Sequence, residues 1–359
     1  MSYYDVYKAY KGEDWAELAV RSADREIREF ASLLLPAAEK DLEGTAARAH
    51  EITLRNFGRT IQLYTPIYIA NYCENACRYC GFNTKNKIKR RRLTPEELRT
   101  EAVNIASTGL EHVLVLAGES RDKSPLSYIK YCVGVLKEYF SSISIEISPL
   151  TVPEYTELIG EGVDGLTVYQ EVYDEGTYKE MHLAGPKRDY RFRLDAPERG
   201  AIAGMRSVNI GALLGLEDWR KEAFLVGLHA RYLQDKYPEV EIGLSIPRLK
   251  PEAGGFNIPC KVSDKNLVQM VVAMRIFLPR AGISLSTRES PELRDHLVAL
   301  GITRMSAGSK TSVGGHATTN DRPEGSRQFD ISDPRSVDQI RAMLSEKGYQ
   351  PVLKDWVRI

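Results

Sequence analysis

The stretch IQLYTPIYIANYCENACRYC, residues 61–80, decides the fold, because it joins a predicted strand to a cysteine-rich loop. Residues 61–70 form a short run rich in apolar, aromatic and β-branched side chains, which is typical of a strand. The loop continues to Thr94, where a helical pattern begins. The stretch is therefore the first of a series of strand-then-helix units that fills most of the chain.

Seven more units of this kind follow, so that strands and helices alternate over about 250 residues. The predicted strands are residues 61–70, 112–118, 143–149, 165–172, 207–216, 241–248, 283–289 and 303–310. This alternation predicts the α/β class, with a (β/α)8 TIM barrel, an N-terminal helical segment and a short C-terminal extension. A doubly wound open sheet is the runner-up, and the lack of a GxGxxG pattern after the first strand disfavours it.

Prolines and glycines mark the ends of the predicted helices. Proline is tolerated in a first helical turn, and four predicted helices begin at a proline: Pro95, Pro153, Pro197 and Pro291. Glycine often follows a helix, and this role is expected for Gly109, Gly204, Gly282 and Gly301. Helical periodicity over residues 14–56 completes a division into an N-terminal helical segment (1–58), a barrel (59–312) and a C-terminal loop, helix and tail packed on the barrel (313–359).

Composition and charge limit the classes of partner. The 359 residues include 49 Lys and Arg against 49 Asp and Glu, so no overall field favours nucleic acid or an anionic membrane. Three of the five cysteines are bunched, whereas Cys132 and Cys260 stand alone and are expected to be buried small hydrophobic residues. No apolar run reaches the roughly 18 residues of a membrane span. We therefore expect a cytoplasmic protein without nucleic-acid or membrane partners.

The bunched cysteines, Cys73, Cys77 and Cys80, follow the first strand directly, where a barrel places its chemistry. A structural zinc site would need a fourth ligand, and no nearby His or Cys supplies one. A simple electron-transfer cluster also normally has a fourth cysteine. Three thiolates on a four-iron cluster would instead leave one iron open, and a substrate could take the fourth place.

This loop resembles the signature of the radical S-adenosylmethionine superfamily, Cys-x3-Cys-x2-Cys with an aromatic residue, here Tyr79, before the last cysteine. The resemblance implies one [4Fe-4S] cluster on the three cysteines, with S-adenosyl-L-methionine as the ligand of the open iron. It also implies reductive cleavage of S-adenosylmethionine to a 5'-deoxyadenosyl radical.

The same resemblance implies further contacts to S-adenosylmethionine at the second strand. LAGES, residues 116–120, resembles the Gly-Gly-Glu motif of the superfamily, with Ala117 in place of the first glycine. Gly118 and Glu119 would then receive the methionine amino group, since backbone carbonyls and a carboxylate can accept its hydrogen bonds.

Glu146 and Arg193 are the other predicted contacts to S-adenosylmethionine. Glu146 ends the third strand and could accept both ribose hydroxyls, with a solvated polar residue as the alternative. Arg193 is the candidate for the carboxylate, because a guanidinium group binds a carboxylate through two hydrogen bonds. Arg191 lies two residues away and is an alternative.

Longer segments resemble the 2-iminoacetate synthases, the tyrosine lyases of thiazole biosynthesis. These segments are residues 35–73, 169–173, 286–297 and 306–333. The resemblance implies that the radical takes hydrogen from L-tyrosine and that the Cα–Cβ bond breaks, which yields 2-iminoacetate and 4-cresol for the thiazole of thiamine. It also implies a protein partner, the thiazole synthase that consumes 2-iminoacetate.

Three residues are candidates for binding the amino-acid substrate. Arg288, at the end of the seventh strand, could hold the substrate carboxylate, with Ser306 of the eighth strand beside it. An ion pair between Arg288 and its neighbour Glu289 is the alternative. Tyr68 could contact the substrate amine through its hydroxyl, or it could be a core tyrosine.

Two segments near the site have candidate roles. The basic run TKNKIKRRR, residues 84–92, is either a solvated face or a docking surface for an acidic flavodoxin or ferredoxin. Charge reversal of Lys87, Lys89 and Arg90 would test docking. TSVGGHATTNDRPEG, residues 311–325, is either a lid that keeps water from a radical or an ordinary surface loop.

Three other functions stay open. A tryptophan-cleaving relative would differ in a ring pocket that the sequence does not reveal. The tyrosine lyase of hydrogenase maturation carries a second cluster on a C-terminal domain, which is not expected here because Cys132 and Cys260 have no companion at cluster spacing. A non-catalytic iron-sulfur carrier would not cleave S-adenosylmethionine.

Overall fold

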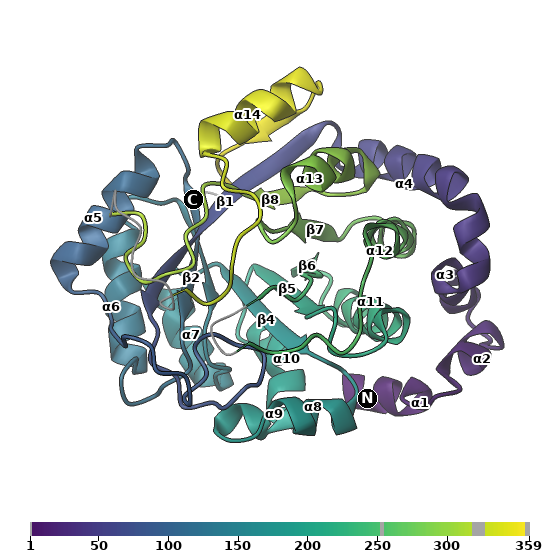
Figure 1. The fold of residues 1–359 in the computed structure, drawn as a ribbon, viewed down its shortest axis with the longest axis horizontal. Helices are drawn as coiled ribbons and strands as arrows, with labels where there is room; N and C mark the ends of the chain where they lie inside the picture. Colours follow the sequence, from purple (N-terminus) through teal and green to yellow (C-terminus); the bar gives the residue numbers. More distant parts are fainter. Residues whose placement is uncertain (1, 252–254, 318–326, 356–359) are drawn as a thin grey trace.

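Figure 1 shows the computed structural model of the chain, which describes residues 2–251, 255–317 and 327–355. A ring of parallel strands lies at its centre, with helices around it. The strands of the ring are β1 (Thr60–Ala70), β2 (His112–Ala117), β3 (Ser142–Glu146), β4 (Gly165–Glu171), β5 (Ser207–Ala212), β6 (Glu241–Ser245), β7 (Gly282–Leu285) and β8 (Arg304–Ser306). Each begins within one residue of its predicted position.

Hydrogen bonds close these strands into a barrel. Strands β2 to β8 pair in chain order, and β1 closes the ring by pairing with β8 at residues 62–64 and with β2 at residues 65–70. All of these pairings are parallel. The predicted (β/α)8 barrel is therefore confirmed, and the open doubly wound sheet is wrong. The carboxyl ends of the strands meet at one end of the barrel, so the loops there can form a single site.

Helices cover the outside of the barrel (Figure 1). They are α5 (Pro95–Ala106), α6 (Leu126–Leu136), α7 (Val152–Glu161), α8 (Glu175–Met181), α9 (Tyr190–Leu194), α10 (Ala196–Ile202), α11 (Trp219–Lys236), α12 (Asp264–Phe277), α13 (Pro291–Leu297) and α14 (Val337–Glu346). The predicted prolines lie in the first turns of α5, α7, α10 and α13. At α5 the Thr94 side chain accepts a hydrogen bond from the Glu97 N–H, which completes a capping box.

Three of the four predicted glycines end helical segments with a left-handed backbone. Gly109, Gly204 and Gly301 have φ values of 85°, 91° and 128°. The prediction for Gly282 is wrong, because Gly282 is the first residue of β7. Helix α12 already ends at Phe277, and the chain reaches the strand through a turn at residues 279–280.

The N-terminal helices are α1 (Tyr3–Tyr10), α2 (Trp15–Val20), α3 (Arg25–Leu34) and α4 (Leu42–Phe57). In Figure 1 they curve around the side of the barrel that carries α11 and α12. Helix α1 lies before the predicted helical region. The sequence does not predict this helix, because its charged and tyrosine-rich residues lack aliphatic side chains at helical spacing. Tyrosine provides its buried face instead: Tyr3 and Tyr7 are each 1% exposed, and the Tyr3 hydroxyl donates to the Leu225 carbonyl at 2.7 Å.

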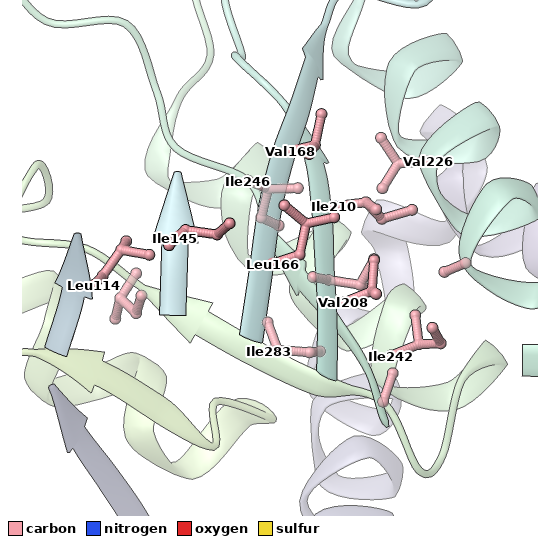
Figure 2. Close-up of a cluster of buried hydrophobic side chains, with 14 of the residues drawn as sticks. Leu114, Ile145, Leu166, Val168, Val208, Ile210, Val226, Ile242, Ile246 and Ile283 are labelled. Atoms are coloured by element: carbon pink, nitrogen blue, oxygen red, sulfur yellow. The ribbon is translucent and has the colours of Figure 1, made fainter. Parts of the chain in front are cut away.

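Apolar side chains fill the layer between the barrel and the helices. Figure 2 shows Val208 and Ile210 of β5 and Ile242 of β6 on the side of the strands that faces Val226 of α11. All four side chains are at most 1% exposed. Burying such a side chain contributes about 1.5–3 kcal/mol, so this layer fixes the strands on which the site depends. Cys132 is buried in the same core as predicted, whereas Cys260 is only half-buried.

A short strand that the sequence did not predict, β9 (Gln350–Val352), pairs in parallel with the first residues of β1. It follows α14 and sits beside the barrel, outside the ring. Its three residues include a proline and form no apolar run, so no strand pattern marks it. None of the helices in the described ranges is long and apolar enough to cross a membrane.

Candidate active site

A cavity of about 120 Å³ lies at the carboxyl ends of the barrel strands. Its wall contains six of the predicted site residues: Tyr68, Tyr79, Cys80, Glu146, Arg288 and Ser306. The other five lie outside the cavity wall within the described chain: Cys73, Cys77, Gly118, Glu119 and Arg193. Strands from opposite sides of the barrel therefore bring predicted cluster, cofactor and substrate residues to one place.

The cysteine loop is held by backbone hydrogen bonds to two other loops. The N–H of Glu74 donates to the Glu119 carbonyl at 2.9 Å, which joins the loop to the end of β2. The Arg78 N–H donates to the carbonyl of Met181, the last residue of α8, and the Ala76 N–H donates to the carbonyl of Ala184 just after this helix, at 3.0 Å each. Because these bonds use main-chain groups, they fix the loop whatever its side chains are.

The three thiols fit an iron-sulfur cluster better than a single metal ion. Burial raises the pKa of all three, to about 11 for Cys80, although the Lys187 ammonium opposes this shift at Cys77 and Cys80. Backbone groups of Asn75 and Glu119 oppose it at Cys73. In the described ranges no three His, Cys, Asp or Glu side chains converge to hold one ion. Thiolates are the soft ligands that iron-sulfur clusters take.

Tyr79 lines the cavity with its ring but directs its hydroxyl away from it. The hydroxyl lies 2.7 Å from His182 Nε2, and His182 Nδ1 lies 2.7 Å from the Tyr178 carbonyl. A carbonyl only accepts, so Nδ1 carries the proton and Nε2 accepts from Tyr79. Burial lowers the pKa of His182 to about 3 and keeps it neutral. Tyr79 is thereby fixed beside the last cysteine.

Gly118 and Glu119 lie where β2 meets the cysteine loop. A Cβ atom at Gly118 would come within 2.3 Å of the Tyr72 carbonyl oxygen, so this position requires glycine. The Glu119 carboxylate accepts from Arg193 at 2.8 Å and from Asn75 Nδ2 at 2.9 Å. These partners outweigh burial and lower the pKa of Glu119. Glu119 is therefore a carboxylate already engaged in a hydrogen-bond network.

The two arginine candidates occupy different surroundings. Arg193 is 6% exposed and donates from Nε to the Tyr169 carbonyl at 2.6 Å, in addition to its bond with Glu119. Arg191 instead pairs with Asp195 at 3.2 Å on the outside of the barrel. Of the two arginines, Arg193 is the one close to the cysteine loop, and its role in binding a carboxylate stays a prediction.

The sequence did not point to two charged residues, Glu171 and Lys187, that complete this network. Lys187 Nζ lies 2.6 Å from a Glu171 carboxylate oxygen and 4.0 Å from Glu119, and both side chains line the cavity or touch its wall. Glu171 has a φ of 72°, the sole positive value at a non-glycine residue in the described chain. Such strain is retained where the surroundings fix a side chain. The position of Glu171 at the end of a barrel strand could have indicated a site residue, whereas no feature of the sequence marks the loop residue Lys187.

Glu146 projects from the end of β3 into the cavity. Within the described residues its carboxylate has no hydrogen-bond partner. Burial, followed by repulsion from Glu171, raises the pKa of Glu146 to about 7, and the Arg288 charge opposes this shift. Glu146 can therefore gain or lose a proton near neutral pH, a property that the sequence did not predict.

Arg288 is a cation without a carboxylate partner in the described chain. Its guanidinium carbon lies 3.3 Å from the ring centre of Phe329, and its side chain lines the cavity. Burial lowers the pKa of Arg288. Its neighbour Glu289 pairs with Arg248 instead, at 2.9 Å from Nε, so the alternative of a plain Arg288–Glu289 ion pair is wrong.

Ser306 and Tyr68 lie in the same cavity wall. The Ser306 hydroxyl oxygen accepts from the Thr287 N–H at 3.1 Å, which ties β8 to the loop that carries Arg288. The Tyr68 hydroxyl donates to Gln328 Oε1 at 2.6 Å. Tyr68 is only 2% exposed, so it is both a core tyrosine and part of the cavity wall.

The basic run is partly structural. Lys87 and Lys89 are exposed, but Arg90 is half-buried and donates to the carbonyls of Asn71, Phe82 and Asn83 at 2.6–2.8 Å. Arg90 therefore holds the cysteine loop. The expectation that Arg90 belongs to an exposed basic surface is wrong.

The candidate lid, residues 311–325, is only partly described. Residues 318–325 lie outside the described residues. The first part, residues 311–315, is buried, and His316 Nε2 lies 2.9 Å from the Pro66 carbonyl. This part packs against β1 and is not an exposed surface loop.

Two family models match the chain. The model of the Radical SAM superfamily matches residues 67–225, which include the last residues of β1, the cysteine loop and β2 to β5. The model of the Biotin and Thiamin Synthesis associated domain matches residues 245–350, which include β7, β8 and Arg288. Together the two matches cover both halves of the barrel.

Similar proteins cover almost the whole chain. The 2-iminoacetate synthases of Escherichia coli and Salmonella typhimurium are each 40% identical over 341 residues, which is 95% of this chain and 90% of theirs. Among solved structures, the FeFe-hydrogenase maturase HydG from Carboxydothermus hydrogenoformans has a TM-score of 0.83 and 32% identity. That match covers 97% of this chain and 82% of the maturase.

Proposed function

Because the chain belongs to the 2-iminoacetate synthase family of radical S-adenosylmethionine enzymes, we propose that it cleaves the Cα–Cβ bond of L-tyrosine. The products are 2-iminoacetate and 4-cresol, and the reaction serves the thiazole of thiamine. Sequence identity is higher for the 2-iminoacetate synthases than for the hydrogenase maturase, 40% against 32%, and so is the matched share of the relative's own length, 90% against 82%. The related lyases therefore rank behind this function.

The observation that supports this proposal most directly is Arg288, which has no carboxylate partner among the described residues and lies in the cavity that Cys80 also lines. A free amino acid brings a carboxylate, and a desolvated guanidinium group is the side chain best suited to bind it. Ser306 lies beside Arg288 in the same wall. Substrate would thus be held within reach of the cluster loop.

Cys73, Cys77 and Cys80 would hold one four-iron cluster, and Gly118, Glu119, Glu146 and Arg193 would contact S-adenosylmethionine. When bound, the cluster and S-adenosylmethionine supply the 5'-deoxyadenosyl radical that starts the reaction. On binding, Glu119 and Arg193 would exchange the hydrogen bond between them for hydrogen bonds to the amino and carboxylate groups of the methionine part. Lys187 and Glu171 form a second ion pair beside this one, so the buried network contains two cations and two anions.

The cavity also needs to exclude water and handle protons. Leu114, Leu116, Leu213 and Phe329 give its wall an apolar part, which limits water near a reactive radical. Glu146, with its raised pKa, can exchange a proton with a bound substrate near neutral pH.

An anaerobic assay tests the function. Reconstituted, reduced protein is mixed with S-adenosylmethionine and each aromatic amino acid, and 5'-deoxyadenosine and the aromatic product are measured by mass spectrometry. We expect 4-cresol from tyrosine. An indole product from tryptophan would show that tryptophan is the substrate in place of tyrosine. An intact four-iron cluster that forms no 5'-deoxyadenosine would indicate an electron carrier.

We also propose that a flavodoxin or ferredoxin reduces the cluster and that a thiazole synthase receives 2-iminoacetate, in the cytoplasm. Lys87 and Lys89 are exposed next to the cysteine loop and suit an acidic reductant. Arg90 is left out of the test because it holds the loop.

The variant Lys87→Glu with Lys89→Glu should slow reduction by flavodoxin about tenfold at low salt and leave reduction by dithionite unchanged. The control, Lys40→Glu with Lys347→Glu, changes the charge equally at exposed sites before α4 and directly after α14. Equal slowing with both reductants would contradict docking at this surface.

A further inference from the structure

Residues 327–333, here called the strap, border the active-site cavity. Gln328 and Phe329 both line it. The Gln328 N–H donates to the Thr311 carbonyl at 3.0 Å, and the Thr311 hydroxyl donates to the Phe329 carbonyl at 2.9 Å. In Figure 1 the yellow-green chain after β8 passes in front of β1 and β2, in agreement with these contacts. The strap is therefore fastened to the loop that follows β8.

The strap also touches the cluster loop directly. The Gly81 N–H donates to the Gln328 carbonyl at 3.2 Å, and a Cβ atom at Gly81 would lie only 2.6 Å from that oxygen. Such close approach of two backbones requires glycine. The Gln328 side chain reaches the cluster side as well, because Nε2 donates to Cys80 Sγ at 3.9 Å.

Tyr68 fixes which way the Gln328 amide points. Its hydroxyl donates to Oε1 at 2.6 Å, so the carbonyl end of the amide faces Tyr68 and the NH₂ end faces Cys80. Tyr68 lines the substrate cavity. A change in the hydrogen bonding of Tyr68 would therefore alter the bond at the sulfur.

Phe329, the next residue of the strap, stacks on the Arg288 guanidinium at 3.3 Å. Two adjacent strap residues thus touch one predicted cluster ligand and two predicted substrate residues, Arg288 and Tyr68. In the described chain this is a direct bridge between the two halves of the cavity.

We propose that Gln328 is a positioning residue that links substrate binding to the reduction potential of the cluster. Its amide N–H stabilises negative charge on Cys80, and Tyr68 sets the orientation of that N–H. Tyrosine bound against Tyr68 and Arg288 changes this bond and with it the ease of reduction. The substrate in this inference rests on the proposed function. The effect of Gln328 on the reduction potential requires only the iron-sulfur cluster that the family implies.

Hydrogen bonds to cluster sulfurs raise the reduction potential, because reduction adds negative charge that an N–H donor stabilises. Loss of one bond to a charged group changes an equilibrium by about tenfold. For a one-electron couple, a tenfold change corresponds to about 59 mV. Removing the Gln328 donor should therefore lower the midpoint potential by an amount that a redox titration resolves.

The test compares wild-type holoenzyme with Gln328→Leu, which removes the N–H donor without adding charge, and with Gln328→Glu, which keeps the shape but replaces the donor by a carboxylate and so also adds negative charge beside Cys80. The midpoint potential is read from the electron paramagnetic resonance signal of the reduced cluster, with S-adenosylmethionine, in the absence and presence of tyrosine. Iron and sulfide content per chain confirms that each variant holds its cluster. Both variants should be reduced about tenfold less at a fixed potential, and tyrosine should shift the wild-type signal alone.

Two further variants make the result specific. Tyr68→Phe frees the Gln328 amide to turn, so it should reproduce part of the decrease in potential seen with Gln328→Leu. The double variant, Tyr68→Phe with Gln328→Leu, should have the same potential as Gln328→Leu alone. Ser309→Ala alters the same cavity wall, and because the Ser309 hydroxyl has no hydrogen-bond partner among the described residues, this variant should keep the wild-type potential.

Equal potentials for the wild type and both Gln328 variants would overturn the inference. A tyrosine effect that persists in these variants would overturn the link to substrate. Failure to form 4-cresol would instead overturn the proposed function, and it leaves the potentials with S-adenosylmethionine alone as a separate result.

Discussion

At the scale of single residues, Arg288 carries the substrate proposal. Arg288→Ala should lower kcat/KM for tyrosine by about 10²-fold, since each hydrogen bond to a charged group contributes about 1.5–3 kcal/mol. Steady-state 4-cresol formation measures this loss, and binding of tyrosine to the holoenzyme should weaken with it.

Arg191→Ala is the matched control for this change. It removes the same side chain from an exposed ion pair with Asp195, and it should leave kcat/KM within about twofold of wild type because exposed pairs contribute little. Equal losses in the two variants would mean that Arg288 has a general structural role.

Glu146 makes a prediction about pH. Its folded-state pKa, about 7, exceeds the ordinary value, so the folded chain binds more protons than the unfolded chain between about pH 4.5 and 7. Stability therefore falls as pH rises through this window. Glu146→Gln removes the penalty and should raise the free energy of unfolding at pH 8 by up to about 3 kcal/mol, with little effect near pH 4.5.

Urea unfolding of the wild type and the variant at a series of pH values measures this difference. Glu138→Gln, at an exposed position after α6, is the control and should give no pH-dependent gain. A constant difference between Glu146→Gln and wild type at every pH would contradict a titration of Glu146.

Residue roles were predictable where position and chemistry coincide. The cysteine triplet and Arg288 follow strands that the sequence reveals, so the barrel rule places them at one end. The partners that decide their surroundings come from afar: Lys187 lies in a loop, and Phe329 reaches Arg288 from a segment without strand or helix. Such contacts depend on how loops pack, which no local pattern records.

At the scale of elements, the residue after β2, Gly118, packs tightly against the backbone at the start of the cysteine loop. Gly118→Ala would place a Cβ atom 2.3 Å from the Tyr72 carbonyl oxygen, so the loop must shift. Overpacking of this kind costs about 1–3 kcal/mol. We expect less iron bound per chain after reconstitution and a lower free energy of unfolding.

Gly134→Ala, within α6, provides the contrast. A Cβ atom there meets nothing within 4 Å, and alanine should stabilise the helix by about 0.5–1 kcal/mol. Iron content should equal that of wild type. Normal iron binding by Gly118→Ala would show that the loop adapts freely.

Strand starts were predictable, and the ends of β1, β2 and β4 also lie within one residue of their predicted positions, but the other five strands end three or four residues earlier than expected. The fifth strand was expected to reach residue 216 but ends at Ala212. The apolar pattern continues because Leu213 and Leu216 pack in a second core cluster with Cys77 and Tyr79. Apolar residues after the strand therefore serve the site and not the sheet, and hydrophobicity alone cannot separate the two.

At the scale of the whole molecule, one buried ion pair ties the C-terminal part to the barrel. Asp333 of the strap pairs with Arg294 of α13, and neither side chain is exposed. Asp333 also pairs with Arg335 at 2.7 Å. Asp333→Ala leaves a buried cation unpaired and should lower the free energy of unfolding by about 3–5 kcal/mol.

Asp338→Ala, whose side chain is 83% exposed in its pair with Arg341, should change stability by less than about 0.5 kcal/mol. Urea denaturation of both variants makes the comparison. Equal small effects would show that the strap is held by its other contacts alone.

The architecture as a whole followed from alternation and size, because closure of eight parallel units leaves few other arrangements. The position of α1 and of β9 did not follow. Helix α1 buries tyrosines against α11, and β9 is formed by backbone bonds that carry no side-chain pattern. The division of the chain into three segments stays a prediction.

The pairing of β9 and β8 with β1 has a consequence for biosynthesis. The ribosome makes β1 early, but its neighbours β8 and β9 follow only after residue 304. At about 5–20 residues per second, one edge of β1 stays unpaired for tens of seconds. The cysteine loop directly after β1 therefore emerges beside an open sheet edge, in a nascent chain whose ring cannot close until β8 has been made.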